Sequence, residues 1–206
     1  MSVVVTGAAG DAGRAVCAAL LEAGHTVVAV GSNEGRLMEV AASVRLACDL
    51  TDPAATRGLA AHVRDQAGPA DALVHLVGGW RAGNGDDDWS WLEPRILTTL
   101  RLTTLALMDD LTASSAGRLV TIGSTSEAKP TWGGANYATL KLAASAWVSA
   151  VASGWRKAGT GAAVELLVQS IGTEGTPVET IAARIVGVLD GPAAELNGAR
   201  VDLTRS

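Results

Sequence analysis

The chain has 206 residues, 48% of them hydrophobic and 18% charged, which suits one globular domain with a substantial core and excludes intrinsic disorder. The net charge of −5 and the scattered Lys and Arg residues argue against nucleic acid as a partner. No run reaches the roughly 18 apolar residues of a membrane span, and the start of the chain lacks a signal-peptide pattern. We therefore expect a cytoplasmic protein without a membrane partner, and we expect Cys17 and Cys48 to be free thiols.

Short apolar runs alternate with amphipathic segments from one end of the chain to the other. In chain order the pattern predicts a strand at 2–5, a helix at 11–23, a strand at 26–30, a helix at 34–42, a strand at 44–48, a helix at 53–66, a strand at 72–77, a loop at 78–90, a helix at 94–113, a strand at 118–122, a helix at 135–157, a strand at 163–168, a helix at 178–189 and a strand at 199–203. Strands that alternate with helices in this way are parallel and joined by right-handed crossovers. We therefore predict an α/β fold in one domain, 1–206: a doubly wound parallel sheet (Rossmann fold) of about seven strands with helices on both faces.

A glycine-rich loop separates the first expected strand from the first expected helix. Gly7 allows the tight turn, Gly10 lets the backbone approach a pyrophosphate, and Gly13 lets the helix pack closely. The helix N-terminus then offers free N–H groups to the phosphates, although the carboxylate of Asp11 would repel them unless it only caps the helix. The alternative is an ordinary βα turn. The expected dinucleotide-binding residues here are Thr6, Gly7, Gly10, Asp11, Ala12 and Gly13.

The end of the second expected strand indicates which dinucleotide binds. NAD-binding sites usually carry an acidic residue at this place, but here no carboxylate precedes Glu34. Ser32 and Asn33 can donate hydrogen bonds and Arg36 can supply positive charge to a 2′-phosphate, so we expect NADP(H) in preference to NAD(H). The alternative for Ser32 and Asn33 is a helix N-cap.

The ends of the next two strands provide further candidates, since strand carboxyl ends line the ligand crevice of a doubly wound sheet. Asp49, followed by Leu50, is placed to bind the adenine amino group, or else to cap the following turn. Val77, Gly78 and Gly79 follow the fourth strand and are expected to contact the cofactor.

Tyr137, the only tyrosine, and Lys141 form the candidate catalytic pair. Their spacing of four residues places both side chains on one face of an expected helix. An ammonium beside a phenol favours the phenolate, so we expect Lys141 to lower the pKa of Tyr137 toward working pH. Such a tyrosine can give a proton to a carbonyl oxygen while a hydride arrives at carbon. Ser124 ends the fifth expected strand and can hydrogen-bond the same substrate oxygen. The alternative is a surface Tyr–Lys pair.

Taken together, the glycine loop, Ser124 and the segment Tyr137-Ala138-Thr139-Leu140-Lys141 resemble the short-chain dehydrogenase/reductase family over essentially the whole chain. The resemblance implies an NAD(P)(H)-dependent oxidoreductase in which Tyr137 is the acid/base, Lys141 also holds the nicotinamide ribose and Ser124 orients the substrate. It also implies that the helices 94–113 and 135–157 pair with a second subunit in a homodimer or homotetramer.

The sequence departs from the family pattern at four points, one of which is a glycine spacing closer to that of the family's extended members. His75-Leu76-Val77-Gly78 replaces the usual Asn-Asn-Ala-Gly, and Gln169-Ser170 replaces the usual Pro-Gly. Thr99 stands where the family has a helix Asn that anchors a relay water, and its hydroxyl can still hold a water. His75 is interpreted as a satisfied strand histidine rather than a catalyst.

The loop 78–92 carries the substrate signals. Val77-Gly78-Gly79-Trp80, followed by Gly83, is locally similar to the dihydropteridine-reductase branch of the family, whose substrate is a flat quinonoid heterocycle. One or two of the loop tryptophans can stack on a planar or apolar small-molecule substrate, or else plug loops against the core. The candidates are Trp80, Trp89, Trp91 and Trp132, while the acidic run 86–88 is interpreted as a solvated loop tip without a metal.

The function expected from these signals is NAD(P)H-dependent reduction, or the reverse oxidation, of a small carbonyl or conjugated imine. Two alternatives stay open. One is a non-catalytic NADP(H)-binding regulatory protein, and the other is a non-redox enzyme on the same scaffold, such as an epimerase, dehydratase or cyclase.

Overall fold

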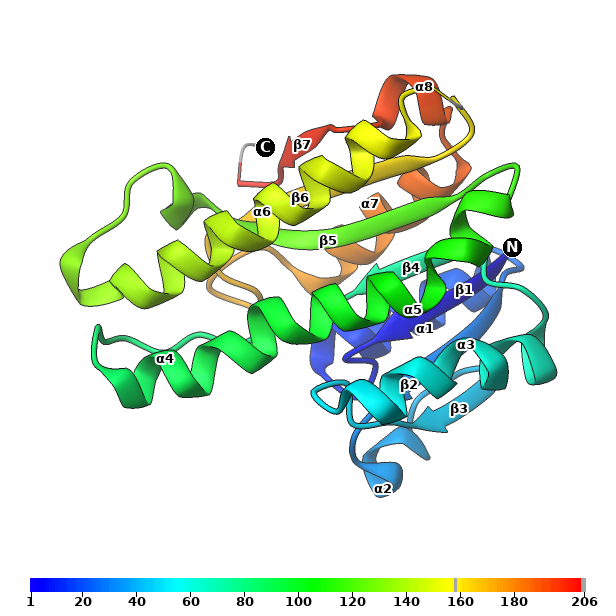
Figure 1. The fold of residues 1–206 in the computed structure, drawn as a ribbon, viewed down its shortest axis with the longest axis horizontal. Helices are drawn as coiled ribbons and strands as arrows, with labels where there is room; N and C mark the ends of the chain where they lie inside the picture. Colours follow the sequence, from blue (N-terminus) through cyan, green and yellow to red (C-terminus); the bar gives the residue numbers. More distant parts are fainter. Residues whose placement is uncertain (158, 205–206) are drawn as a thin grey trace.

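In the computed structural model, which describes residues 1–157 and 159–204, the strands form one parallel sheet in the order β3-β2-β1-β4-β5-β6-β7 (Figure 1). Parallel pairing holds along the whole order, from β2–β3 at one edge to β6–β7 at the other. The strands are β1 (Ser2–Thr6), β2 (Thr26–Gly31), β3 (Val44–Ala47), β4 (Ala72–His75), β5 (Arg118–Ser124), β6 (Ala162–Val168) and β7 (Arg200–Asp202). The predicted doubly wound α/β fold is confirmed.

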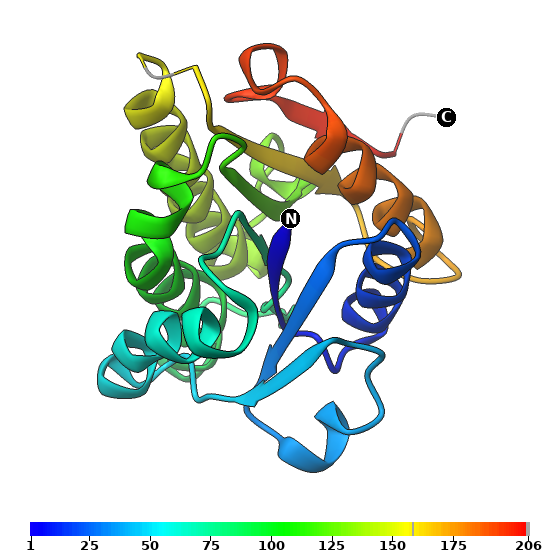
Figure 2. The same ribbon diagram turned by 90° about the vertical axis from the view of Figure 1, so that its right-hand side faces the viewer.

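Helices cover both faces of the sheet, as the view along its edge shows (Figure 2). One face carries α1 (Asp11–Glu22) and α7 (Val178–Asp190), which pack on each other. The opposite face carries α3 (Pro53–Ala67), α5 (Thr99–Ala113) and α6 (Ala135–Trp155). Three short helices complete the fold: α2 (Glu34–Leu37), α4 (Asp86–Glu93) and α8 (Ala193–Leu196).

The central strands have no solvent-facing side, which explains their continuous apolar runs. In β1, Val3 and Val5 face the core beneath α1 and α7, and Val4 between them faces the core beneath α3, α5 and α6. Side chains alternate across a strand, so each strand supplies both cores. The sheet is thereby fixed between two apolar layers, and its polar carboxyl edge is left for a ligand.

Two predicted segments end at other residues in the structure than the sequence pattern indicates. The helix expected at 34–42 stops at Leu37, since Gly35 weakens so short a helix and a turn then buries Val40 in the core. The loop expected at 78–90 contains the start of α4, so the acidic run 86–88 is a first helical turn and not a loop tip. Carboxylates are stabilised there by the positive end of the helix dipole.

The long helix predicted at 94–113 begins differently from an ordinary α-helix. A π-helical turn, Pro94–Thr98, precedes α5 and follows α4 without a break. Proline has no N–H to donate and fits such a first turn. Because π turns widen the helix, this one offsets α4 from α5 at the end that faces the carboxyl edge of the sheet.

Arg118 joins the sheet to the end of α7. It is only 4% exposed, and its guanidinium donates to the carbonyls of Val188 (3.2 Å), Gly117 (3.0 Å) and Gly191 (2.7 Å). Burial lowers the pKa of Arg118, and carbonyls rather than a carboxylate stabilise its charge.

The substitution Arg118→Met should therefore lower the free energy of unfolding by about 2–4 kcal/mol, since several buried carbonyls lose their donor. Urea unfolding measures this loss. The matched control is Arg57→Met on the exposed surface of α3, which should change stability by less than about 0.5 kcal/mol. Equal effects of the two substitutions would show that the Arg118 contacts contribute nothing.

Candidate functional site

Two adjoining cavities lie along the carboxyl edge of the sheet, where the strand order reverses between β1 and β4. The first has a volume of about 670 Å³ and extends over the ends of β2 and β3. The second has a volume of about 720 Å³ and extends over β5, β6 and the start of α6. Both are lined by Gly7, Gly10 and Leu76-Val77-Gly78, so they form one groove. Such a reversal point is where ligands bind in open α/β sheets.

The glycine loop forms the floor shared by the two cavities. Gly7 has φ +70°, a conformation that only glycine adopts without strain, and a Cβ on Gly13 would lie 2.4 Å from the Gly7 carbonyl oxygen. Gly10 precedes α1 and offers no side-chain cap, so the first N–H groups of α1 are left for another acceptor. Asp11 is the exposed first residue of α1 and lines the second cavity with Ala12 and Gly13.

The substitution Gly13→Ala should weaken NADPH binding by at least about 100-fold and lower the free energy of unfolding by about 1–3 kcal/mol, because the new methyl overlaps backbone atoms that cannot yield cheaply. Isothermal titration and urea unfolding measure the two effects. Gly58→Ala in α3 is the control, since its Cβ meets nothing closer than 3.9 Å. NADPH affinity that survives Gly13→Ala would contradict this role of the loop.

The first cavity brings together the residues predicted for the adenosine half of a dinucleotide. Ser32, Asn33, Arg36, Asp49 and Leu50 all line it. The side chain of Asn33 also caps α2, because its Oδ1 accepts the Arg36 N–H at 2.9 Å. The Arg36 guanidinium donates to the Ala9 carbonyl at 2.9 Å, which holds its charge against the glycine loop.

Asp49 is engaged in its own turn. Its Oδ1 accepts both the N–H (2.9 Å) and the hydroxyl (2.7 Å) of Thr51. These bonds lower the pKa of the exposed Asp49 carboxyl. The turn-capping alternative for Asp49 is therefore present in the structure, and adenine binding stays a prediction.

A polarised chain of hydrogen bonds runs beneath the loop through Thr6, His75 and Thr99. The Thr99 hydroxyl donates to the Arg95 carbonyl (2.9 Å), so it accepts from Nε2–H of His75 (3.3 Å). Nδ1 of His75 then accepts from the Thr6 hydroxyl (2.9 Å). Burial and the charge of Lys141 lower the pKa of His75 to about 3, so the ring is neutral. His75 is a satisfied strand histidine, as expected.

This chain of hydrogen bonds limits two predicted site residues. Thr6 is fully buried and lines neither cavity. Thr99 lines the first cavity, but its hydroxyl is already bonded to Arg95 and His75. The Thr99 hydroxyl can therefore hold a relay water only by accepting a hydrogen bond from it, since its single proton is already donated to Arg95.

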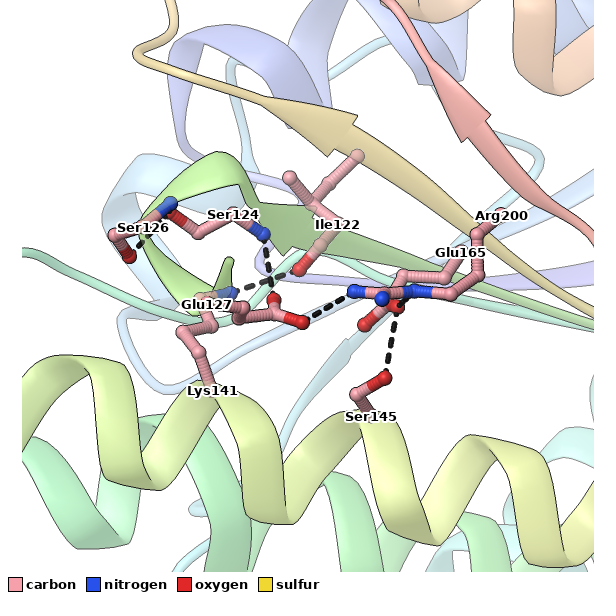
Figure 3. Close-up of polar contacts among 8 residues, drawn as sticks. All are labelled: Ile122, Ser124, Ser126, Glu127, Lys141, Ser145, Glu165 and Arg200. Atoms are coloured by element: carbon pink, nitrogen blue, oxygen red, sulfur yellow. Dashed lines mark hydrogen bonds and ion pairs between the residues drawn. The ribbon is translucent and has the colours of Figure 1, made fainter. Parts of the chain in front are cut away.

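The second cavity holds the predicted catalytic group. Tyr137 and Lys141 line it from the first two turns of α6, and Ser124 ends β5 next to them. The Ser124 side chain lies near the Tyr137 phenol and acts to lower its pKa, while the Ser124 hydroxyl is hydrogen-bonded to the Ser126 hydroxyl at 2.8 Å. The Lys141 ammonium donates to the Ile122 carbonyl at 2.8 Å and lies 5.9 Å from the centre of the Tyr137 ring (Figure 3). Tyr137 and Lys141 thus line one end of the groove, and Ser124 lies at the strand end beside them but is not part of the cavity lining.

The expected lowering of the Tyr137 pKa by Lys141 is wrong for the chain as it stands. Burial raises the pKa of Tyr137, the Ser124 hydrogen bond opposes this and the charge of Glu127 adds to it. Burial lowers the pKa of Lys141, and Glu127 and Glu165 oppose that change. The ammonium of Lys141 is directed at a backbone carbonyl instead of the phenol oxygen, and desolvation of the phenol outweighs it.

Apolar side chains also line the second cavity. They are Trp80, Ile96, Leu100 and Ile171. Trp80 is 69% exposed, so its ring is available to a ligand at the mouth of the cavity. Of the other loop tryptophans, Trp91 stacks under the Arg95 guanidinium at 4.3 Å and packs against the core, while Trp89 and Trp132 lie outside the cavity lining.

The loop that carries Trp80 is fixed to the segment before α6. The Gly83 N–H donates to the Gly133 carbonyl (2.7 Å), and the Asn136 amide donates to the Gly85 carbonyl (2.8 Å). A Cβ on Gly79 would lie 2.8 Å from the Trp91 ring, so glycine is needed there. The prediction that this loop shapes the site agrees with its place on the second cavity.

Several site residues carry no sequence motif. Gln169 and Ser170 follow β6 and line the second cavity. Glu127, Glu165 and Arg200 form an ion-pair network behind Ser124 and Lys141 (Figure 3). For this network, the signal in the sequence is the charge of Glu165 within the apolar run Ala162–Val168, while Gln169 and Ser170 stand out only as a departure from the family pattern.

Among residues 1–157 and 159–204, no group of three or more His, Cys, Asp or Glu side chains is placed to hold a metal ion. Within the same residues, no helix is both long and apolar enough to cross a membrane. Cys17 is buried and Cys48 is half-buried, and both are free thiols, as expected; burial raises the pKa of Cys17 to about 12.

Comparison with known proteins gives consistent matches. A family model described as short chain dehydrogenase matches residues 1–180. A 3-oxoacyl-(acyl-carrier-protein) reductase from Salmonella typhimurium is 29% identical over 147 residues, 67% of this chain and 60% of the relative. A 2,3-dihydro-2,3-dihydroxybenzoate dehydrogenase from Bacillus subtilis is 30% identical over 156 residues, 68% of this chain and 58% of the relative. The chain thus spans about 60% of the length of these curated relatives.

Two solved structures share the fold over nearly the whole chain. A variant of actinorhodin polyketide ketoreductase with NADPH has a TM-score of 0.86 at 18% identity and covers 98% of this chain and 95% of its own. An NADPH-bound short chain oxidoreductase from Pseudomonas aeruginosa, described as having an atypical catalytic center, has a TM-score of 0.89 at 17% identity and covers 98% and 94%. The local similarity to dihydropteridine reductase is not tested by these matches and stays a prediction.

Proposed function

The chain belongs to the short-chain dehydrogenase family, and on this premise we propose that it is an oxidoreductase that uses NADP(H) to reduce a small carbonyl compound or conjugated imine, with Tyr137 as the acid. The observation that carries the proposal is the geometry of the groove. Its glycine floor leads directly to the half-buried Tyr137, with Ser124 and Lys141 nearby.

The residues present fit a dinucleotide. A Cβ could not be accommodated at Gly7 or Gly13, so the backbone there is free to lie against a pyrophosphate, and the N-terminus of α1 faces the same place. Leu76-Val77-Gly78 continues the groove toward Lys141. Both similar solved structures described above contain NADPH, which supports the same cofactor class.

For the choice of cofactor, we infer a preference for NADP(H). Ser32, Asn33 and Arg36 line the first cavity where an NAD site usually has a carboxylate. The guanidinium of Arg36 is held beside the loop and would pair with a 2′-phosphate.

In the mechanism, Tyr137 holds the proton that is transferred to the substrate oxygen. When bound, the nicotinamide supplies the hydride. Ser124, at the end of β5 near Tyr137, orients the substrate oxygen toward the phenol. Lys141 lies 5.9 Å from the centre of the Tyr137 ring, and its ammonium stabilises the phenolate left after proton donation once it turns from the Ile122 carbonyl toward the phenol. Burial keeps the Tyr137 pKa raised, so the group is protonated and able to donate at neutral pH.

The substrate class is inferred from the apolar side chains that line the second cavity. Trp80, Ile96, Leu100 and Ile171 favour an apolar or planar substrate, because an aromatic ring offers large contact area and stacking. We also infer a homodimer or homotetramer, since Leu105 of α5 and Leu142 of α6 are 51% and 46% exposed on the two long helices.

The test is consumption of NADPH with a panel of aromatic ketones, quinones, aliphatic ketones and a quinonoid pterin, followed by product identification. Turnover with planar or apolar members supports the proposal. NADPH binding without turnover of any member would favour a regulatory protein, and product without net NADPH consumption would favour a non-redox enzyme.

A further inference from the structure

A network of charged residues lies behind the candidate catalytic group. Glu127 and Glu165 are 3% and 4% exposed at their side chains, and both pair with Arg200 of β7. The Arg200 Nε lies 2.6 Å from Oε2 of Glu165. The Arg200 Nη2 pairs with the carboxylate of Glu127. The Ser145 hydroxyl donates to Glu165 at 3.0 Å, and Lys141 lies beside the network (Figure 3).

Glu127 is also bonded to the strand end that carries Ser124. Its Oε1 accepts the Ser124 backbone N–H at 2.8 Å, while its Oε2 pairs with Arg200. The Ser124 hydroxyl oxygen in turn accepts the Ser126 N–H (3.2 Å). Ser124 is thus bonded at both its N–H and its hydroxyl to the 3-10 turn Thr125–Glu127. The place of the Ser124 hydroxyl therefore depends on a carboxylate that Arg200 holds from another strand.

We propose that Glu127, held by Arg200, is a positioning residue that fixes Ser124 and sets the charge beside Tyr137 and Lys141. This inference rests on the proposed function, in which Tyr137 donates a proton. It assigns a role to the last strand of the sheet, which none of the catalytic residues occupies.

The charges around the site support this role. The groups that face Tyr137 and Lys141 are Glu127, Glu165 and the neutral ring of His75, with Arg200 behind the two carboxylates. The negative charge of Glu127 acts with burial to raise the pKa of Tyr137. The same charge, with that of Glu165, opposes the fall in the Lys141 pKa that burial causes.

Arg200 keeps this arrangement ionised. Burial raises the pKa of Glu127 and the neighbouring Glu165 raises it further, whereas the Ser124 N–H, Arg200 and Lys141 lower it. Two buried carboxylates could not both stay charged without such a cation. The Tyr137 phenol therefore keeps its proton beside Lys141, as a proton donor requires.

The single tyrosine permits a direct test that needs no turnover. The ultraviolet difference spectrum of the phenolate is titrated in wild type, Glu127→Gln and the surface control Glu22→Gln, with Tyr137→Phe as the blank. Circular dichroism at each pH confines the comparison to folded protein. We expect Glu127→Gln to form phenolate at lower pH than wild type and Glu22→Gln to match wild type. If the phenolate of Glu127→Gln forms at the same pH as in wild type, or at a higher pH, the proposal is overturned.

A second variant separates charge from position. Glu127→Asp keeps the charge but shortens the reach to Ser124, so its phenolate titration should match wild type while kcat falls by about tenfold. A wild-type kcat in Glu127→Asp would overturn the positioning role even if Glu127→Gln did not fold. If the wild type consumes no NADPH, the proposed function fails, yet the titration still reports on Glu127.

Discussion

Replacing Tyr137 by Phe should lower kcat for NADPH-dependent reduction by at least about 1000-fold, because general acid catalysis by a positioned group contributes up to about 10⁴-fold. The ring of Tyr137 packs against the core beneath α3, α5 and α6. The substitution by Phe therefore keeps this packing and removes only the hydroxyl. Steady-state kinetics on the best substrate of the panel measures the loss.

The control for this variant is cofactor affinity. NADPH should bind Tyr137→Phe within about threefold of wild type, since the residues proposed to hold the pyrophosphate and the 2′-phosphate, the glycine loop and Arg36, lie elsewhere in the groove. Full turnover in Tyr137→Phe would remove Tyr137 from the mechanism. A parallel loss of NADPH binding would mean that the phenol holds the cofactor instead of transferring a proton.

Placing a carboxylate at the end of β2 should reverse the cofactor preference. Ser32→Asp puts a negative charge where the 2′-phosphate is expected, so the Kd for NADPH should rise by about 100-fold. The Kd for NADH should stay within about threefold or fall, since Asp can accept from the ribose hydroxyls. Fluorescence titration, with energy transfer from tryptophan to the nicotinamide as the readout, measures both.

Ser32→Asn is the matched neutral control, because it changes the size but not the charge of an exposed side chain. Its NADPH affinity should remain within about threefold of wild type. Wild-type preference for NADH, or equal NADPH affinity in Ser32→Asp and Ser32→Asn, would contradict the assignment of this end of the groove.

The fold could be predicted from the sequence because its signals are local. Apolar runs such as the one that forms β1 alternate with helical segments, and this rhythm predicts a parallel sheet. The errors lie where tertiary packing decides. Burial of Val40 ends α2 early, and the helix α4 begins inside a loop rich in Gly and Asp.

The candidate site could be predicted from the sequence where its residues lie in a single helix or a single loop. Tyr137 and Lys141 share one helix, and Gly7, Gly10 and Gly13 share one loop, so their spacing carries the information. The charged network was not predictable, since Glu127 and Arg200 meet only through the pairing of β5, β6 and β7. The pKa of Tyr137 was missed for the same reason: burial, not the neighbouring lysine, has the largest effect on it.

Hydride transfer itself is the central claim, and isotope transfer measures it most directly. NADPH deuterated on the transferred side of nicotinamide C4 is incubated with the protein and the best carbonyl substrate, and the product is analysed by mass spectrometry. We expect one deuterium on the former carbonyl carbon for each NADPH consumed with wild type, and none above background with Tyr137→Phe. Product that forms without deuterium, or deuterium transfer that persists in Tyr137→Phe, would contradict hydride transfer with Tyr137 as the acid.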